Sequence, residues 1–234
     1  MSQPGNGFRA GLDSVLLGAS VNPGSATLLD LGAGVGTAAL VALAHNERLT
    51  ATLVEADAEM AALAALNISA NGFAERAELL TLDVTAKSAL RAAAGLRADH
   101  YASVIANPPF FDPRQGTAPS AGRAAARHMQ AEVLDLWIKA AATSAAPGGE
   151  IIFIHAAAAL PPLLRAFGAR FGGITILPLI PREGQPANRV LVRGIKGSRA
   201  PLTLLASRAL HEPAGRGFRP EFDAIFRGDA RLGW

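Results

Sequence analysis

The chain has 234 residues, which is enough for one α/β domain with a buried core, and we expect a single domain over residues 1–234. Half of its residues are hydrophobic, but no uninterrupted apolar run reaches the roughly 20 residues that a membrane helix needs. The chain has no cysteine, which excludes disulfides and thiolate metal sites, and we expect a cytoplasmic protein with no membrane partner.

The charge is uneven along the chain. The formal net charge is only +3, yet from Arg193 onward eight lysines and arginines stand against four acidic residues. We interpret residues 198–234 as a basic C-terminal tail. Such a tail suits a polyanionic partner such as RNA, but an arginine-rich composition that leaves solvated side chains explains it equally well.

Seven short apolar runs predict β-strands, and alanine- and leucine-rich stretches between them predict helices. Apolar runs without strict alternation are typical of strands that are covered on both faces, as in parallel sheets. We expect strands at residues 27–31, 51–55, 78–82, 101–106, 150–155, 174–179 and 189–193, and helices at 37–44, 58–70, 85–94, 131–145 and 156–171. This alternation predicts an α/β fold, a doubly wound sheet with helices on both faces.

The connection before the last expected strand differs from the others. Residues 180–188 are too few and too rich in proline and glycine for a helix, so the last two strands form a hairpin and one of them runs antiparallel. The sequence therefore predicts a seven-stranded, mostly parallel sheet that ends in an antiparallel hairpin. Residues 112–128, which contain many small residues, are expected to form a mobile loop.

A glycine-rich turn follows the first expected strand. The segment Asp30-Leu-Gly-Ala-Gly-Val-Gly-Thr37 has glycines at positions 32, 34 and 36, which permit a tight turn and let a ligand approach the backbone. Its G-x-G-x-G spacing has Thr37 where a dinucleotide fingerprint has its third glycine. Alone, such a turn is weak evidence for a nucleotide site.

Acidic residues follow the next two expected strands. Glu55 ends the second strand, about 20 residues beyond the turn, where a carboxylate accepts hydrogen bonds from ribose hydroxyls. Asp83 comes after the third strand, where it suits an adenine amino group. Singly these residues are ordinary strand-end acids or helix caps. Together with the turn they predict a cofactor site at the carboxyl edge of the sheet, which is where open α/β sheets bind ligands.

The segment Asn107-Pro-Pro-Phe110 follows the fourth expected strand. A carboxamide, two rigid prolines and an aromatic ring make a surface that is polar and then flat, and such a surface suits a planar amino group. Asparagine before proline is also a common turn. Its position beside the glycine turn favours an acceptor site, in which Asn107, Pro108 and Phe110 act on the substrate.

With these motifs, the chain resembles the class I S-adenosylmethionine-dependent methyltransferases that carry an N-P-P-[YF] motif, and most closely the tRNA adenine-N6 methyltransferases. These enzymes modify the adenine beside the anticodon of a valine tRNA. The segment Leu12-Asp-Ser-Val-Leu-Leu-Gly18 resembles their T-D-G-[VI]-L-L-G, with Leu12 and Ser14 in place of threonine and glycine. Phe111-Asp-Pro, Ala126-Arg127 and Leu210-His-Glu-Pro-Ala-Gly215 are similar as well.

The resemblance implies a Rossmann-like fold, S-adenosylmethionine as cofactor, tRNA as substrate and no metal. Residues 1–26 would then flank the substrate and the cofactor. Residues of the motifs that would bind the cofactor are Asp30, Gly32, Gly34, Gly36, Glu55, Asp83 and Asn107. Residues that would contact the substrate are Asp13, Pro109, Phe111, Arg114, Arg123 and Arg127.

Other readings remain open. The same cofactor site also serves methylation of guanine N2 in ribosomal RNA or of a glutamine side chain, and Phe110 occurs in the guanine enzymes. An NAD-dependent oxidoreductase is disfavoured by Thr37 and by the terminal hairpin. A noncatalytic RNA-binding module is disfavoured because the motif residues are chemically competent. The sequence leaves the oligomeric state open.

Overall fold

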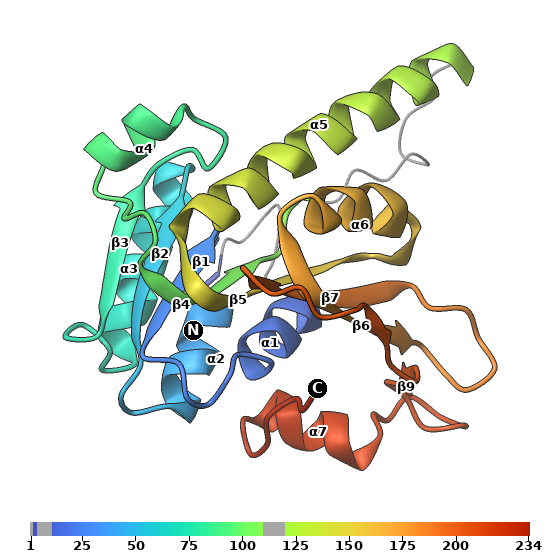
Figure 1. Cartoon of the computed structure of the whole chain (residues 1–234). Helices are drawn as coiled ribbons and strands as arrows, with labels where there is room; N and C mark the ends of the chain where they lie inside the picture. The colour runs from blue at the N-terminus through green and yellow to red at the C-terminus, as the bar shows by residue number, and fades with distance from the viewer. Residues whose placement is uncertain (1, 4–10, 110–119) are drawn as a thin grey trace.

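The structure, a computed structural model, describes residues 2–3, 11–109 and 120–234, without the side chains of residues 120–128 and 130. Strands and helices alternate along most of the chain (Figure 1). The strands are β1 (Thr27–Leu31), β2 (Thr50–Glu55), β3 (Ala77–Thr81), β4 (Tyr101–Ala106), β5 (Ala145–Ala156), β6 (Phe171–Ile180), β7 (Arg189–Lys196), β8 (Thr203–Leu204) and β9 (Arg208–Ala209). The helices are α1 (Leu12–Ala19), α2 (Thr37–His45), α3 (Ala58–Ala70), α4 (Ser88–Ala93), α5 (Ser120–Ser144), the short 3₁₀ helix η1 (Ala157–Ala159), α6 (Leu160–Gly168) and α7 (Pro220–Arg227).

The strands form one sheet in the order β3-β2-β1-β4-β5-β7-β6-β8, with β9 also paired to β6. The pairs from β3 through β5 are parallel, and β7 runs antiparallel between β5 and β6. The mostly parallel α/β sheet and its terminal hairpin are therefore confirmed. The expected strand count was two short, because β8 and β9 have only two residues each and leave no periodic signal.

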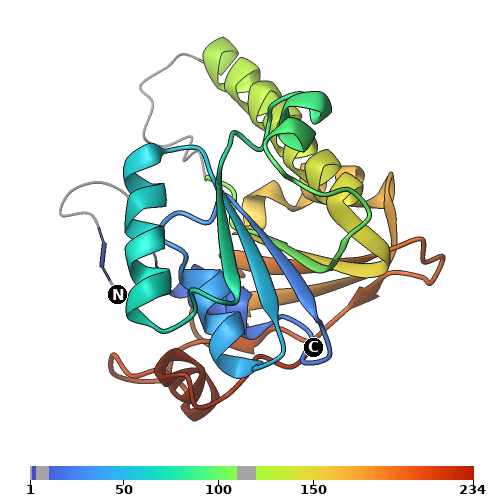
Figure 2. The ribbon, with the colours of Figure 1, turned by 90° about the vertical axis from the view of Figure 1, so that its left-hand side faces the viewer.

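Helices cover both faces of the sheet, as the alternation predicted (Figures 1 and 2). On one face, α5 and α6 bury residues such as Ile138 and Phe167 against β4, β5 and β7. On the other face, α1, α2, α3 and α7 bury residues such as Leu17, Leu43 and Phe222. Neighbouring residues of β5 go to opposite cores, Phe153 to the first and Ile152 to the second. This is the pattern of a strand that is buried on both sides.

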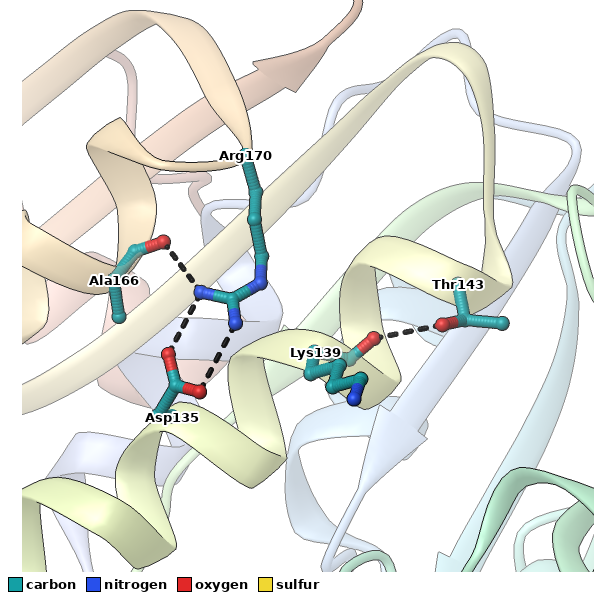
Figure 3. Close-up of polar contacts among 5 residues, drawn as sticks. All are labelled: Asp135, Lys139, Thr143, Ala166 and Arg170. Carbon is teal, nitrogen blue, oxygen red and sulfur yellow. Dashed lines mark hydrogen bonds and ion pairs between the residues drawn. The ribbon is translucent and has the colours of Figure 1, made fainter.

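Helix α5 begins earlier than the sequence indicated. Residues 112–128 were expected to be a loop, but the backbone is helical from Ser120 onward, because the alanines in this stretch favour a helix. Asp135 on α5 forms two hydrogen bonds with the Arg170 guanidinium, at 2.7 and 3.0 Å (Figure 3). Arg170 also donates to the Ala166 carbonyl oxygen at the end of α6. These contacts hold α5 and α6 together.

Helix α1 was not predicted, because it is short and its stability depends on packing. A Cβ added at Gly18 would lie 2.2 Å from the Ala38 carbonyl oxygen, so only glycine allows α1 to approach α2 this closely. The last residues of the chain hold the other end of α1. Leu232 N donates to the Ala19 carbonyl oxygen at 3.0 Å, and Trp234 Nε1 donates to that of Ser20 at 2.9 Å.

In the part of the chain that the structure describes, no helix combines the length and the apolar character that crossing a membrane requires.

Candidate functional site

The first four strands bring the predicted site residues to one edge of the sheet. Strands β3, β2, β1 and β4 are adjacent and parallel, so their carboxyl ends lie side by side. The glycine turn follows β1, Glu55 ends β2, Asp83 follows β3, and Asn107 follows β4. This edge is where ligands bind in open α/β sheets.

The glycine turn needs glycine for two different reasons. Gly32, Gly34 and Gly36 all have positive φ, at 66°, 56° and 88°, a region that other residues rarely adopt. A Cβ at Gly32 would lie 2.3 Å from the Trp137 ring, so this glycine admits a core side chain from α5. Among the residues that the structure describes, a Cβ at Gly34 would meet nothing within 4 Å. The backbone of Gly34 therefore borders open space that a ligand can approach.

A small pocket of about 30 Å³ lies between this turn and Asn107. It brings together four of the predicted site residues, Asp30, Gly32, Gly34 and Asn107. The sequence did not indicate the other residues that line it, which are Ser14, Ala33, Val35, Ala38 and Met60. Ser14 lies in the segment that carried the resemblance, whereas Met60 has no sequence signal and reaches the pocket only through the packing of α3.

Glu55, Asp83 and Gly36 do not line this pocket. Glu55 Oε2 accepts a hydrogen bond from Gly34 N at 2.7 Å, so the carboxylate lies directly against the glycine turn. Asp83 is exposed, and its Oδ1 accepts hydrogen bonds from the backbone and the hydroxyl of Thr85, each at 2.7 Å. Gly36 is the residue that precedes the first turn of α2. All three lie beside the pocket, along the same edge of the sheet.

Asp30 is a buried carboxyl group that lines the pocket. Only 2% of its surface is exposed, and Oδ2 accepts a hydrogen bond from Ala39 N at 3.1 Å. The pKa of Asp30 is raised to about 7, chiefly because burial disfavours the charged form; the hydrogen bond from Ala39 lowers it and the nearby charge of Glu55 raises it. Asp30 therefore changes its charge near neutral pH.

The two polar atoms of the Asn107 side chain differ in their contacts. Nδ2 lies 3.4 Å from Ser14 Oγ, whereas the buried Oδ1 has no hydrogen-bond partner among the described residues. A buried acceptor without a partner costs free energy, typically about 1–3 kcal/mol. Such an atom marks a position where a ligand that carries an N–H or O–H group would gain stability.

Of the other residues predicted to contact the substrate, the structure describes the side chains of some and not of others. Asp13 forms an ion pair with Arg189, with 2.7 Å between Oδ2 and Nε, beside the contact between Ser14 and Asn107. Pro108 is buried and Pro109 is exposed. Phe110, Phe111 and Arg114 lie outside the described residues. Arg123 and Arg127 belong to α5, but their side chains are not described.

A second hollow, of about 670 Å³, lies at the end of β6. Its charged lining consists of Glu183, Glu212, Glu221, Arg208 and Arg219, and neither the glycine turn nor Asn107 borders it. Although this hollow is larger, the small pocket is the better candidate site because the motif residues meet there. Among the residues described, no group of three or more His, Asp or Glu side chains is placed to hold a metal ion.

The family model of the methyltransferase small domain matches residues 13–169. The tRNA1(Val) (adenine(37)-N6)-methyltransferase of Shewanella amazonensis is 38% identical over 128 residues, which are 53% of this chain and 50% of the relative. The enzyme of the same name from Shewanella halifaxensis is 31% identical over 194 residues, which are 80% of this chain and 75% of the relative. The chain thus spans half of the first relative and three quarters of the second.

Among solved structures, a predicted O-methyltransferase, protein Atu636 of Agrobacterium tumefaciens, has a TM-score of 0.80. It is 32% identical, and the match covers 95% of this chain and 99% of the other. The tRNA (m1A58) methyltransferase TrmI of Aquifex aeolicus has a TM-score of 0.56 at 15% identity, covering 84% of this chain and 72% of that protein. The second likeness concerns the fold alone.

Proposed function

The chain belongs to the methyltransferase small domain family, and from this premise we propose that it is an S-adenosylmethionine-dependent enzyme that methylates N6 of an adenine in tRNA, near the anticodon. The buried Asn107 Oδ1, which has no partner among the described residues, carries the proposal because it suits an amino group. The names of the two Shewanella relatives support adenine in tRNA as the acceptor.

The residues around the pocket fit the proposed cofactor. The open space above Gly34 admits a ligand against the backbone, and the Glu55 carboxylate lies beside it to accept hydrogen bonds from ribose hydroxyls. Asp83 Oδ1 would accept a hydrogen bond from the adenine amino group in place of the one that it accepts from the Thr85 hydroxyl. When bound, S-adenosylmethionine supplies an electrophilic methyl group. The enclosed pocket is much smaller than this molecule, so most of the ligand would lie along the open edge of the sheet.

Asn107 and Pro108 would prepare the acceptor nitrogen. An exocyclic aromatic amine is a poor nucleophile because its lone pair is delocalised into the ring. Hydrogen bonds from this amine to Asn107 Oδ1 and to the Pro108 carbonyl oxygen favour a pyramidal nitrogen with an available lone pair. Two successive prolines restrict the backbone here, so these acceptors are held in place before the substrate arrives. We propose that Phe110 stacks on the base and that Pro109 and Phe111 extend this surface.

An oxygen acceptor is the second candidate, because the Agrobacterium protein is described as a predicted O-methyltransferase. Methylation of a hydroxyl usually needs a base that removes the proton. His155, near the end of the neighbouring strand β5, is poorly suited, since burial lowers its pKa to about 4 and makes it a weak base. An amine, in contrast, can attack before it loses a proton. The Asn107 Oδ1 acceptor and the names of the two Shewanella relatives therefore favour nitrogen over oxygen.

The test is transfer of radiolabelled methyl groups to total tRNA, followed by digestion to nucleosides. We expect N6-methyladenosine as the labelled product. Label in N2-methylguanosine, in protein or in an O-methylated nucleoside would reject adenine N6 and identify the competing acceptor. A thermal-shift assay tests the cofactor separately: we expect stabilisation by S-adenosylhomocysteine, and stabilisation by NADH alone would contradict the proposal.

Two variants test the role of Asn107. Asn107→Ala removes the acceptor atom and is expected to lower kcat by at least about 100-fold, as for other preorganised polar groups in active sites. Asn107→Asp keeps acceptor oxygens and should retain more activity than the alanine variant. Both should still bind S-adenosylhomocysteine, because the glycine turn and Glu55 are unchanged. Full turnover by Asn107→Ala would refute the assigned role.

A further inference from the structure

Ser14 is a buried polar residue that faces the acceptor side of the pocket. Only 9% of its surface is exposed, and it lines the pocket together with Asn107 and the glycine turn. Its Oγ lies 3.4 Å from Asn107 Nδ2, and 93 positions separate the two residues in the sequence. This is the hydrogen bond that the described residues offer to the Asn107 amide.

The orientation of the Asn107 amide decides what the substrate meets. Rotation by half a turn about the Cβ–Cγ bond exchanges the oxygen with the NH2 group, and this torsion has a broad, roughly two-fold energy profile. With Nδ2 toward Ser14, the oxygen is available as an acceptor for an amine. In the opposite orientation, an NH2 group would face another NH2 group, and neither can accept. A serine hydroxyl can accept from Nδ2 or donate to Oδ1, so its contact holds the amide in place. Because only the oxygen can accept from the substrate amine, the orientation with Nδ2 toward Ser14 is the productive one.

Helix α1 holds Ser14 firmly enough for this task. Ser14 lies in the first turn, where its N–H donates to the Gly11 carbonyl oxygen at 3.1 Å. Further along the helix, Leu16 and Leu17 are completely buried, and Gly18 lets α1 pack closely against α2. Since α2 begins directly after the glycine turn, Ser14 and the cofactor side of the pocket belong to one packed unit.

We propose that Ser14 is a positioning residue, whose hydroxyl accepts a hydrogen bond from Asn107 Nδ2 and keeps Oδ1 directed toward the acceptor nitrogen. The inference rests on the proposed function of Asn107. At 3.4 Å the contact is at the long end of the hydrogen-bond range, but hydrogen bonds in ligand-free active sites are often long and shorten when the substrate binds.

Two substitutions at this position separate positioning from structural support. Ser14→Ala keeps the Cβ but removes the acceptor, and we expect kcat to fall about tenfold while KM for S-adenosylmethionine changes less than about twofold. Ser14→Gly, which restores the residue of the resembled segment, leaves space for a water molecule that can accept from Nδ2. It should therefore lose less turnover than Ser14→Ala.

The melting temperatures of the two variants are expected to follow the opposite order to their turnover. Alanine favours a helix and glycine disfavours it, so Ser14→Gly should have a lower melting temperature than Ser14→Ala. Turnover that falls in the same order as the melting temperature, with Ser14→Gly below Ser14→Ala, would show a structural role and overturn the proposal. Unchanged kcat in Ser14→Ala would overturn it as well.

A measurement on the protein without any methyl acceptor completes the test. In 15N-labelled protein, the side-chain amide signals of Asn107 are identified by their loss in Asn107→Ala. We expect these signals to shift, and their hydrogen exchange to accelerate, in Ser14→Ala but less in Ser14→Gly. Unchanged signals in Ser14→Ala would refute the contact. Failure of the unaltered protein to methylate tRNA would refute the proposed function and leave this readout intact.

Discussion

The Asp13 carboxylate and the Arg189 guanidinium lie 2.7 Å apart, although 176 positions separate the two residues in the sequence. Asp13 is in the first turn of α1, and Arg189 is the first residue of β7. The antiparallel direction of β7 brings its first residue to the same edge of the sheet as Asn107. The ion pair thus joins the helix that carries Ser14 to a strand from the last quarter of the chain.

We expect this ion pair to stabilise the fold measurably. The side chains of Arg189 and Asp13 are only 32% and 23% exposed, so water screens the pair less than a surface pair. A double-mutant cycle with Asp13→Asn and Arg189→Gln, followed by urea unfolding, should give a coupling free energy of about 1 kcal/mol. Asp223 and Arg227 form an exposed pair within α7 and serve as a control, with an expected coupling below about 0.5 kcal/mol. Equal coupling in both pairs would contradict this prediction.

The glycine turn should respond differently at two of its positions. Gly32→Ala combines a strained backbone with a collision against Trp137, and we expect it to lower the free energy of unfolding by about 3 kcal/mol or more. Gly34→Ala meets open space, so the strain of its positive φ should cost only about 1–2 kcal/mol. Calorimetry should show, however, that Gly34→Ala binds S-adenosylhomocysteine much more weakly. Intact binding by this variant would argue against a cofactor at this turn.

Asp30 should make stability depend on pH. Its pKa is about 7 in the folded protein and near 3.8 when unfolded, so between these values the folded state keeps a proton that the unfolded state has released. The free energy of unfolding from this group therefore falls as pH rises from about 4 to 7 and stays constant above that, with a total change on the order of 4 kcal/mol.

Comparison with Asp30→Asn isolates this contribution. The variant resembles the protonated carboxyl, so urea unfolding should show the smallest difference in stability near pH 4 and a variant that becomes increasingly the more stable protein as the pH rises toward 8. His155 has the opposite dependence: its lowered pKa makes stability rise with pH between about 4 and 6.5. Because His155 is present in both proteins, its contribution cancels in the difference. A difference that does not change with pH would refute the shifted pKa of Asp30.

The aromatic ring of Trp234 should contribute to stability through two separate contacts. Its Nε1 donates to the Ser20 carbonyl oxygen at 2.9 Å, and the Arg193 guanidinium lies 4.6 Å from the ring centre. Trp234→Phe removes the first contact and should cost about 1 kcal/mol, whereas Trp234→Ala removes both and should cost about 2 kcal/mol. Equal losses in the two variants, measured by chemical unfolding, would show that the ring itself contributes nothing.

The sequence was sufficient to predict the long strands and to place the candidate site residues at one edge of the sheet. Strands that are buried on both faces have short apolar runs that are visible in the sequence. The glycines at positions 32 and 34 are visible too, because the turn needs residues that adopt a positive φ. Helices α1 and α7 were missed because their formation depends on tertiary packing, such as the contact of Gly18 with α2. The start of α5 was missed because the segment before it contains alanines, which favour a helix, together with glycine and proline, which favour a loop.

Within the site, the residues of the motifs were predictable and their neighbours were not. Asn107, Gly32 and Gly34 could be found because each belongs to a short motif that is visible in its own segment, the Asn-Pro-Pro-Phe segment or the glycine turn. Ser14 reaches Asn107 from α1 through the packing of α1 on α2, and Arg189 reaches Asp13, the neighbour of Ser14, through the antiparallel direction of β7. No local pattern in the sequence encodes either arrangement.

The insertion of β7 between β5 and β6 also determines which part of the chain can be studied alone. The region shared with the family ends at residue 169, before β6 and β7 begin. A fragment that stops there would keep the glycine turn and Asn107. It would nevertheless expose the backbone of β5 from Glu150 to Ala156, which β7 covers in the whole chain. Because unpaired apolar strand edges recruit other chains, such a fragment is expected to aggregate, and the whole chain is the appropriate unit for expression and crystallisation.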